Sequence, residues 1–251
     1  NRNFANKMWN AGRFVISALS EAPQRPSAEP EWTLADSWIL ARVQSVVRDV
    51  ERLFQNYQYG EAGRQIYEFF WSDFADWYVE IAKLQLAEGG NRAFYTAYTL
   101  ARVQDLSLRM LHPFTPFITE ELWGHLRLAV LETFGEVENY GVSMWPLHQD
   151  WKEALMITPW PTPREQGTWE APSIARFSLV QELVRAIRNL RSEKGIAPSL
   201  RLPAIFSADS ETVTLLERQA AVIASLAALD VQKLTICTSE GHIAAPSGHV
   251  G

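Results

Sequence analysis

The feature that most restricts the fold of this chain is a series of apolar stripes at helical spacing in its first two thirds. Apolar residues that recur every three or four positions form one face of an α-helix. The stripes predict helices over about 1–19, 34–57, 61–87 and 91–112, and a short helix over 115–123. Because short connections favour antiparallel neighbours, the sequence predicts an antiparallel helix bundle.

Local signals mark where several of these helices begin. Thr33 and Asp36 have the spacing of a capping box, and Asn91 is of a residue type that caps helix N-termini. Thr115 followed by Pro116 makes a good cap and first-turn pair. These positions predict the starts of the second, fourth and fifth helices.

Aromatic residues divide the chain into two parts of different composition. All ten tryptophans lie within the first 169 residues, and only two phenylalanines follow them. The junction carries three prolines between residues 158 and 163, which remove backbone donors and favour an extended chain. We therefore predict a helical domain over 1–170, with an extended crossing segment near 145–170, and a second region over 171–251.

The second region is expected to mix helices with short strands. Its predicted elements are a helix capped by Ser173 over about 174–194, strands over 202–206 and 231–237, a helix capped by Asp209 that continues to about 229, and a final hairpin over 243–250. The predicted fold class is thus mainly α, an antiparallel helix bundle followed by a small α+β region.

A net charge of −6, from 23 basic and 29 acidic residues, argues at first against a nucleic-acid partner. The charge is unevenly distributed, however. Residues 61–173 carry a net charge of −8, whereas residues 1–60 carry +1 and residues 174–201 carry +4. The overall acidity is an average over unlike segments, and the two less acidic segments each contain a candidate RNA-binding helix.

The first predicted helix carries five polar residues and one aromatic residue that together suit the binding of an RNA loop. They are Arg2, Asn6, Lys7, Asn10, Arg13 and Phe14. Cations reach phosphates, side-chain amides bond to base edges, and an aromatic ring can stack on an unpaired base. A solvated helix face with ordinary ion pairs explains the same residues equally well.

The second candidate is a basic ridge on the helix predicted over 174–194. It consists of Arg185, Arg188, Arg191 and Lys194. A spacing of three residues drifts slowly around a helix, so these cations form a ridge that fits a phosphate backbone. A solvated face is again the alternative.

Other kinds of site are disfavoured. The single cysteine, Cys237, lies in an apolar run typical of core packing, and the five histidines are scattered, so no metal site is expected. The sequence contains no phosphate-binding glycine motif and no apolar run long enough to span a membrane. We therefore expect no catalytic residue, metal or cofactor in this chain.

Three carboxylates form the one arrangement that suggests catalysis. Asp73, Asp76 and Glu80 would lie along one face of an α-helix, where they could perform acid–base chemistry as in a stand-alone hydrolase. We favour a solvated face whose carboxylates pair with basic neighbours.

Five stretches of the chain resemble, in order and approximate spacing, the anticodon-binding domain of valyl-tRNA synthetases. They are RNFANKMWNAGRFV at 2–15, DSWILAR at 36–42, YEFFWSDFADWYVE at 67–80, LHPFTPFITEELW at 111–123 and RNLRSE at 188–193. The class I synthetases for isoleucine, leucine, methionine and cysteine share this helical domain class. The first and fourth stretches point to valine specifically, and the resemblance covers nearly the whole chain.

The resemblance implies a tRNA-binding fragment of an enzyme that attaches valine to valine tRNA in an ATP-dependent reaction. It implies that Phe14 stacks on an anticodon base and that Lys7 and Arg13 contact the anticodon loop. The family's catalytic signatures and editing domain are absent from this sequence. ATP and Mg²⁺ would therefore bind only to the full-length enzyme, whose catalytic and editing domains would lie upstream.

Several further expectations follow from the resemblance. The fragment is not expected to be catalytic on its own. Its partners would be valine tRNA and the upstream domains, its location would be cytoplasmic, and no membrane would be involved. The alternatives are the same domain from an isoleucine or leucine synthetase, or a helical scaffold whose exposed aromatic residues bind protein partners.

Overall fold

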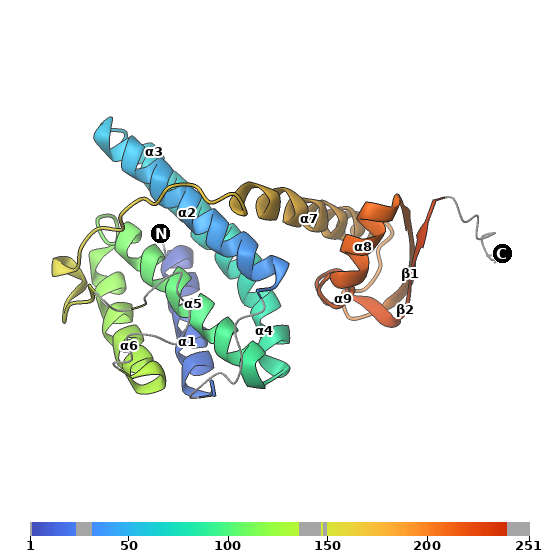
Figure 1. Ribbon diagram of the computed structural model, residues 1–251, viewed down its shortest axis with the longest axis horizontal. Helices are drawn as coiled ribbons and strands as arrows, with labels where there is room; N and C mark the ends of the chain where they lie inside the picture. The colour runs from blue at the N-terminus through green and yellow to red at the C-terminus, as the bar shows by residue number, and fades with distance from the viewer. Residues whose placement is uncertain (1, 24–31, 136–146, 148–149, 240–251) are drawn as a thin grey trace. The chain divides into compact units, whose positions relative to one another are not determined.

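The computed structural model describes residues 2–23, 32–135, 147 and 150–239. The chain forms two compact units, Asn1–Ala175 and Arg176–Gly251 (Figure 1). The first unit is built from helices, and the second contains a two-stranded parallel sheet. The predicted fold class, a helix bundle followed by a small α+β region, is confirmed.

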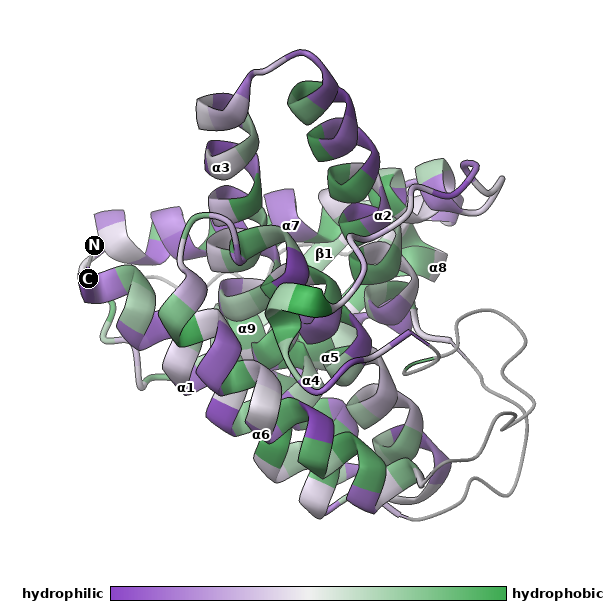
Figure 2. Cartoon of the chain, turned by 90° about the vertical axis from the view of Figure 1, so that its left-hand side faces the viewer, coloured by the Kyte–Doolittle hydropathy of each residue, from purple (hydrophilic) through white to green (hydrophobic). Residues whose placement is uncertain are grey.

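The first unit follows the predicted apolar stripes. Its elements are α1 (Arg2–Ser20), α2 (Leu34–Gln55), α3 (Tyr59–Glu68), η1 (Phe69–Tyr78), α4 (Val79–Ala87), α5 (Gly90–Leu111), α6 (Pro116–Phe134), η2 (Leu155–Ile157) and the start of α7 (Glu170–Glu193). Figure 2 shows helices that are hydrophobic on one side and hydrophilic on the other. The core centres on α5, which is buried from Ala93 to Leu111 and contacts α1, α2, α4 and α6.

Two predicted helix starts are confirmed and one is wrong. The capping box at the start of α2 is present, since Thr33 and Asp36 each accept a hydrogen bond from the other's backbone N–H at 3.0 Å. Thr115 and Pro116 begin α6, which extends well beyond the predicted end at residue 123. The cap of α5 is Gly89 and not Asn91, because the turn needs a φ of +72° that glycine adopts without strain.

The predicted helix over 61–87 contains a long π-helical segment. Between α3 and α4 the ten residues of η1 widen the turn, and the backbone N–H of Val79 bonds to the carbonyl of Phe74, five residues earlier. A π-helix has more residues per turn than an α-helix, so side chains after it point in different directions from those the α-helical spacing predicts. This change decides which carboxylates face α1.

A buried hydrogen-bond network fixes the end of η1 against α2 and α5. The hydroxyl of Tyr78 donates to Asp36 at 2.8 Å, and Arg92 lies 3.4 Å from the same carboxylate. Burial raises the pKa of Asp36, although its hydrogen bonds oppose this shift. A buried carboxylate is costly unless it is bonded, so these contacts hold η1 and α4 in one position.

The extended crossing segment is held to the bundle by side chains of α5 and α6. The guanidinium of Arg109 donates to both oxygens of Asp150, at 2.8 and 3.0 Å, and to the carbonyl of Pro159 at 3.0 Å. The indole of Trp123 donates to the carbonyl of Lys152 at 3.2 Å. The segment from 158 to 166 has no regular secondary structure, as its prolines predict.

The second unit is a compact α/β arrangement. After the continuation of α7, its elements are β1 (Leu202–Ala208), α8 (Ser210–Arg218), α9 (Ala220–Ala227) and β2 (Leu229–Thr238). β1 and β2 are parallel, with Phe206 opposite Ile236. The predicted strands and the Asp209 cap are confirmed.

Three details of the second region differ from prediction or lie outside the described residues. The helix expected to reach residue 229 is interrupted at Gln219, which separates α8 from α9. α7 begins at Glu170, so Ser173 lies inside it and its hydroxyl donates to the carbonyl of Trp169 at 2.7 Å. The hairpin expected over 243–250 lies outside the described residues.

Candidate functional site

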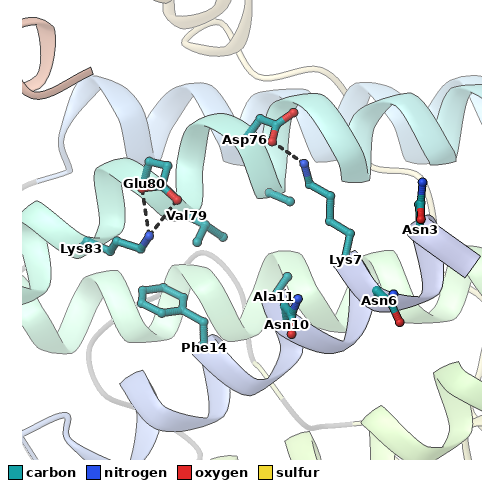
Figure 3. A pocket seen from close by; sticks show the side chains of 11 residues that line it. Asn3, Asn6, Lys7, Asn10, Ala11, Phe14, Asp76, Val79, Glu80 and Lys83 are labelled. Atoms are coloured by element: carbon teal, nitrogen blue, oxygen red, sulfur yellow. Dashed lines mark hydrogen bonds and ion pairs between the residues drawn. The ribbon is translucent and has the colours of Figure 1, made fainter. Parts of the chain in front are cut away.

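The polar side of α1 faces a groove whose opposite wall is η1 and α4 (Figure 3). The groove has a volume of about 500 Å³. It is lined by Asn3, Asn6, Lys7, Asn10, Ala11 and Phe14 from α1, and by Ala75, Asp76, Val79, Glu80 and Lys83 from η1 and α4. The apolar stripe of α1 is buried, so packing in the core turns the polar stripe toward the groove.

The structure brings together four of the six side chains predicted on this helix. Asn6, Lys7, Asn10 and Phe14 line the groove. Arg2 and Arg13 are exposed on α1 and do not line it. The predicted contacts with RNA therefore divide into groove residues and flanking cations.

Four polar residues that line the groove were not among the predicted RNA-binding residues: Asp76 and Glu80, which the sequence suggested only as carboxylates of a catalytic group, and Asn3 and Lys83, which were missed altogether. Asn3 lies three residues before Asn6 and seven before Asn10, so helical spacing could have identified it. Lys83 is distant in sequence from α1 and enters the site only through tertiary packing. Spacing within one helix carries no signal for such a residue.

One end of the groove is organised around the ammonium group of Lys7. It donates a hydrogen bond to Asp76 and lies 4.1 Å from the centre of the Trp71 ring. Trp71 stacks on Tyr67, which packs against Phe4 at the start of α1. A carboxylate and an aromatic face both attract a cation, so Lys7 is held in place before any ligand binds.

The other end of the groove carries an aromatic ring beside a second ion pair. The half-buried ring of Phe14 lies 5.9 Å from the ammonium of Lys83. Lys83 in turn donates to both carboxylate oxygens of Glu80, at 2.7 and 2.9 Å. Figure 3 shows Phe14 extending from α1 toward this pair. The site therefore combines a stacking surface with a neighbouring donor and acceptor.

The prediction that three carboxylates share one helix face is wrong. Asp73 accepts from Arg42 of α2 at 2.9 Å, whereas Asp76 faces Lys7 of α1. The wider turn of η1 separates residues three apart by a larger angle than an α-helix does, which explains the division. Each carboxylate has a basic partner, as the favoured interpretation predicts, and the geometry gives no support to a catalytic group.

The basic ridge on α7 is also not continuous. Arg191 is buried and donates to the carbonyls of Ala197 at 3.0 Å, Leu200 at 2.7 Å and Ala228 at 3.2 Å. Its guanidinium therefore holds the second unit together and is not at the surface.

The remaining ridge residues are exposed. Arg188 donates to the carbonyl of Leu226 at 2.8 Å although much of the residue is exposed, and Arg185 and Lys194 are exposed as well. The exposed part of the ridge thus consists of three residues, not four.

Two further kinds of site are absent from the described parts of the chain. No cluster of three or more histidine, cysteine or acidic side chains there could hold a metal ion. None of the helices described is both long and apolar enough to cross a membrane.

Comparison with known proteins gives one family and a consistent set of relatives. The family described as the anticodon-binding domain of tRNA ligase matches residues 36–206. Valine–tRNA ligases from Chromobacterium violaceum and Carboxydothermus hydrogenoformans are 39% and 38% identical, over 80% and 90% of this chain. The enzyme from Symbiobacterium thermophilum is 39% identical over 84% of it.

The chain spans only about a fifth of the length of these relatives, with 20%, 23% and 23% of their sequences covered. The resemblance to the anticodon-binding region of valyl-tRNA synthetases is confirmed, and the interpretation as a general protein scaffold is not favoured. This chain belongs to the family of anticodon-binding domains of tRNA ligases.

Proposed function

We propose that the groove between α1 and η1–α4 binds the anticodon loop of valine tRNA. The binding would serve a full-length ligase that attaches valine to its tRNA in the cytoplasm. In this proposal ATP and Mg²⁺ act in the catalytic domain of the full-length enzyme, and its catalytic and editing domains are the partners of this chain. The valine–tRNA ligase relatives support the choice of tRNA, since they are 37% to 39% identical over most of the chain.

The observation that carries this proposal is the combination of groups in one groove. Phe14 offers a partly exposed ring, Asn6 and Asn10 offer amides, and Lys7 offers a cation within the same 500 Å³. Recognition of single-stranded RNA relies on stacking of unpaired bases, hydrogen bonds to base edges and cations near phosphates. A merely solvated helix face would not concentrate all three around a concave surface.

The fold suits this function because both walls of the groove are fixed. α1 is anchored by its buried stripe, and the other wall is fixed by the network around Asp36 and Tyr78. A preformed site loses little entropy when it binds a base. The bundle would thus hold the anticodon at a constant distance from a catalytic domain elsewhere in the enzyme.

The distribution of charge supports a weak, salt-sensitive contact. Residues 61–173, which include the η1–α4 wall of the groove, carry a net charge of −8 and repel phosphates in general. Arg2 and Arg13, exposed on α1 beside the groove, would contact the phosphates that flank the bound bases. Arg185, Arg188 and Lys194, which lie in the second unit, would add contacts with phosphates of the RNA backbone.

The test is a titration of the 251-residue chain with an anticodon stem-loop of valine tRNA and with a scrambled anticodon. Phe14→Ala should weaken binding of the valine stem-loop by about 1–3 kcal/mol, the value of one stacked base. Lys7→Ala should weaken it as well. Phe117→Ala on α6, which removes a ring that is 90% exposed, and Lys152→Ala serve as matched controls.

Equal affinity for the two anticodons would contradict the proposal. So would groove variants that bind as tightly as their controls.

A further inference from the structure

The two ion pairs in the groove differ in how accessible their cations are and in what lies beside them. The side chain of Lys7 is only 22% exposed and is held by both Asp76 and Trp71, whereas the side chain of Lys83 is 50% exposed. The two carboxylates are about equally accessible, since Asp76 is 49% and Glu80 is 46% exposed. The second pair is singled out by its place beside the Phe14 ring.

We propose that Glu80 reads the base stacked on Phe14 by accepting a hydrogen bond from an exocyclic amino group. The site would accept adenine, cytosine or guanine, each of which carries such a group, and reject uracil, which carries none. This inference rests on the proposed function of the groove. It assigns a specificity-determining role to a carboxylate of α4.

The position of the pair supports this role. Lys83 lies 5.9 Å from the Phe14 ring and holds the Glu80 carboxylate from one side, at 2.7 and 2.9 Å. A base stacked on Phe14 would extend its edge toward the same place, because the ring faces the pair across the groove (Figure 3). Val79 lies beside them in the lining and offers no competing polar group.

The chemistry of the two groups explains the selectivity. An ionised carboxylate only accepts hydrogen bonds, so it attracts an amino group and repels a keto oxygen. Uracil presents keto oxygens on both sides of its one ring N–H, and a carboxylate that meets this edge faces at least one of them. The ammonium of Lys83 can donate to a neighbouring acceptor on the same base edge.

Lys83 has a second effect, which makes an acidic group tolerable in an RNA site. A lone carboxylate in the groove would repel the phosphates on either side of the base. The adjacent ammonium neutralises it while leaving carboxylate lone pairs available. Glu80 thus selects the base, and Lys83 positions and neutralises Glu80.

The experiment measures binding of the full 251-residue chain to a series of anticodon stem-loops. Each anticodon position that carries an amino group is changed in turn so that a keto oxygen replaces it, as in cytidine to uridine or adenosine to inosine. At one position the parent chain should lose about tenfold in affinity, within the range expected of a specific base contact. The same change at the other positions should have less effect.

The decisive variant is Glu80→Gln, because an amide of the same shape can accept from an amino group or donate to a keto oxygen. It should bind the amino and keto stem-loops with nearly equal affinity, while stacking on Phe14 is retained. Lys83→Met should weaken binding of both the amino and the keto stem-loops. The control is Glu121→Gln on α6, an exposed carboxylate that does not line the groove, and circular dichroism checks that all variants fold.

The outcomes separate this inference from the proposed function. If the parent prefers the valine anticodon and Glu80→Gln still penalises the loss of the amino group, the inference is wrong and the proposed function stands. The same holds if no single amino group affects binding by the parent. If the parent does not distinguish valine from scrambled anticodons, the proposed function fails and the inference fails with it.

Discussion

In α1 the side chains of Lys7, Asn10 and Phe14 line an open groove, whereas in α7 the guanidinium of Arg191 is buried against three carbonyls. Both helices present polar residues at spacings of three and four, and both suggest RNA contact on that basis. The difference lies in what faces them. A buried cation that donates to backbone carbonyls holds the fold together, and a cation that lines a concave surface is available to a ligand.

The largest expected effect concerns Arg191 and tests its role in the stability of the second unit. Arg191→Ala leaves the carbonyls of Ala197, Leu200 and Ala228 without their charged donor. We expect the second unit to lose about 2–3 kcal/mol of stability, because the charge-assisted hydrogen bonds of a buried guanidinium are lost. Hydrogen exchange of the β1 and β2 amides should show the loss. Lys194→Ala, an exposed change directly after the same helix, should leave exchange unaltered.

The next largest effect concerns Lys7 and tests its role in RNA binding by the groove. Lys7→Met keeps most of the apolar stem but removes the ammonium that neutralises Asp76. We expect binding of the valine stem-loop to weaken about tenfold, because a cation is removed and an uncompensated carboxylate faces the RNA. Stability should change by less than about 0.5 kcal/mol, as for other partly exposed pairs.

The variant Lys7→Met/Asp76→Asn provides the control for this prediction. It should recover part of the affinity, because it also removes the uncompensated carboxylate. If the double variant binds the valine stem-loop as weakly as Lys7→Met does, the uncompensated charge of Asp76 does not explain the loss of affinity.

A smaller effect concerns the exposed part of the ridge. Arg185→Ala combined with Lys194→Ala should weaken binding of a complete tRNA about two- to threefold at low salt. The slope of log affinity against log salt should fall by about 0.7–0.9 for each phosphate that the variant no longer neutralises. A salt series measures both, with Arg218→Ala on α8 as an exposed control. An unchanged slope would mean that only α1 binds RNA.

The smallest effect concerns Arg109, whose carboxylate partner Asp150 is half exposed. The hydrogen bond from Arg109 keeps the pKa of Asp150 below its ordinary value of 3.8. The ionised carboxylate therefore adds stability above pH 3.8, and this contribution is lost as the pH falls below that value. Because Asp150 is half exposed, we expect less than about 1 kcal/mol.

Urea unfolding at several pH values tests this prediction. Asp150→Asn should make the decline in stability with acid less steep, whereas Asp49→Asn, in an exposed pair on α2, should not. If the free energy of unfolding of the parent and of Asp150→Asn falls equally steeply with decreasing pH, the prediction is wrong.

The sequence was sufficient for features that depend on nearby residues. The apolar stripes gave five helical stretches, and Thr33 with Asp36 gave a capping box with both hydrogen bonds present. The polar stripe of α1 gave four residues of the groove. Each of these depends on spacing within one helix, which the sequence states directly.

Features that depend on distant packing were not predictable. Lys83 joins the site only because α4 lies beside α1, and Arg191 is buried only because carbonyls of later segments surround it. The π-helical segment was missed for a related reason. Apolar periodicity distinguishes buried from exposed faces, but it does not show where a helix widens by one residue per turn.

The π-helix makes recognition in this domain depend on how one stretch of helix is wound. In an ordinary α-helix the same ten residues, Phe69–Tyr78, would advance about 100° per residue, whereas the wider turn of a π-helix advances less per residue. Over ten residues this difference adds up, so α4 would be rotated about its axis relative to α1. Glu80 and Lys83 would then leave their present place in the groove, so the choice of base depends on the winding of one helix as well as on which side chains it carries.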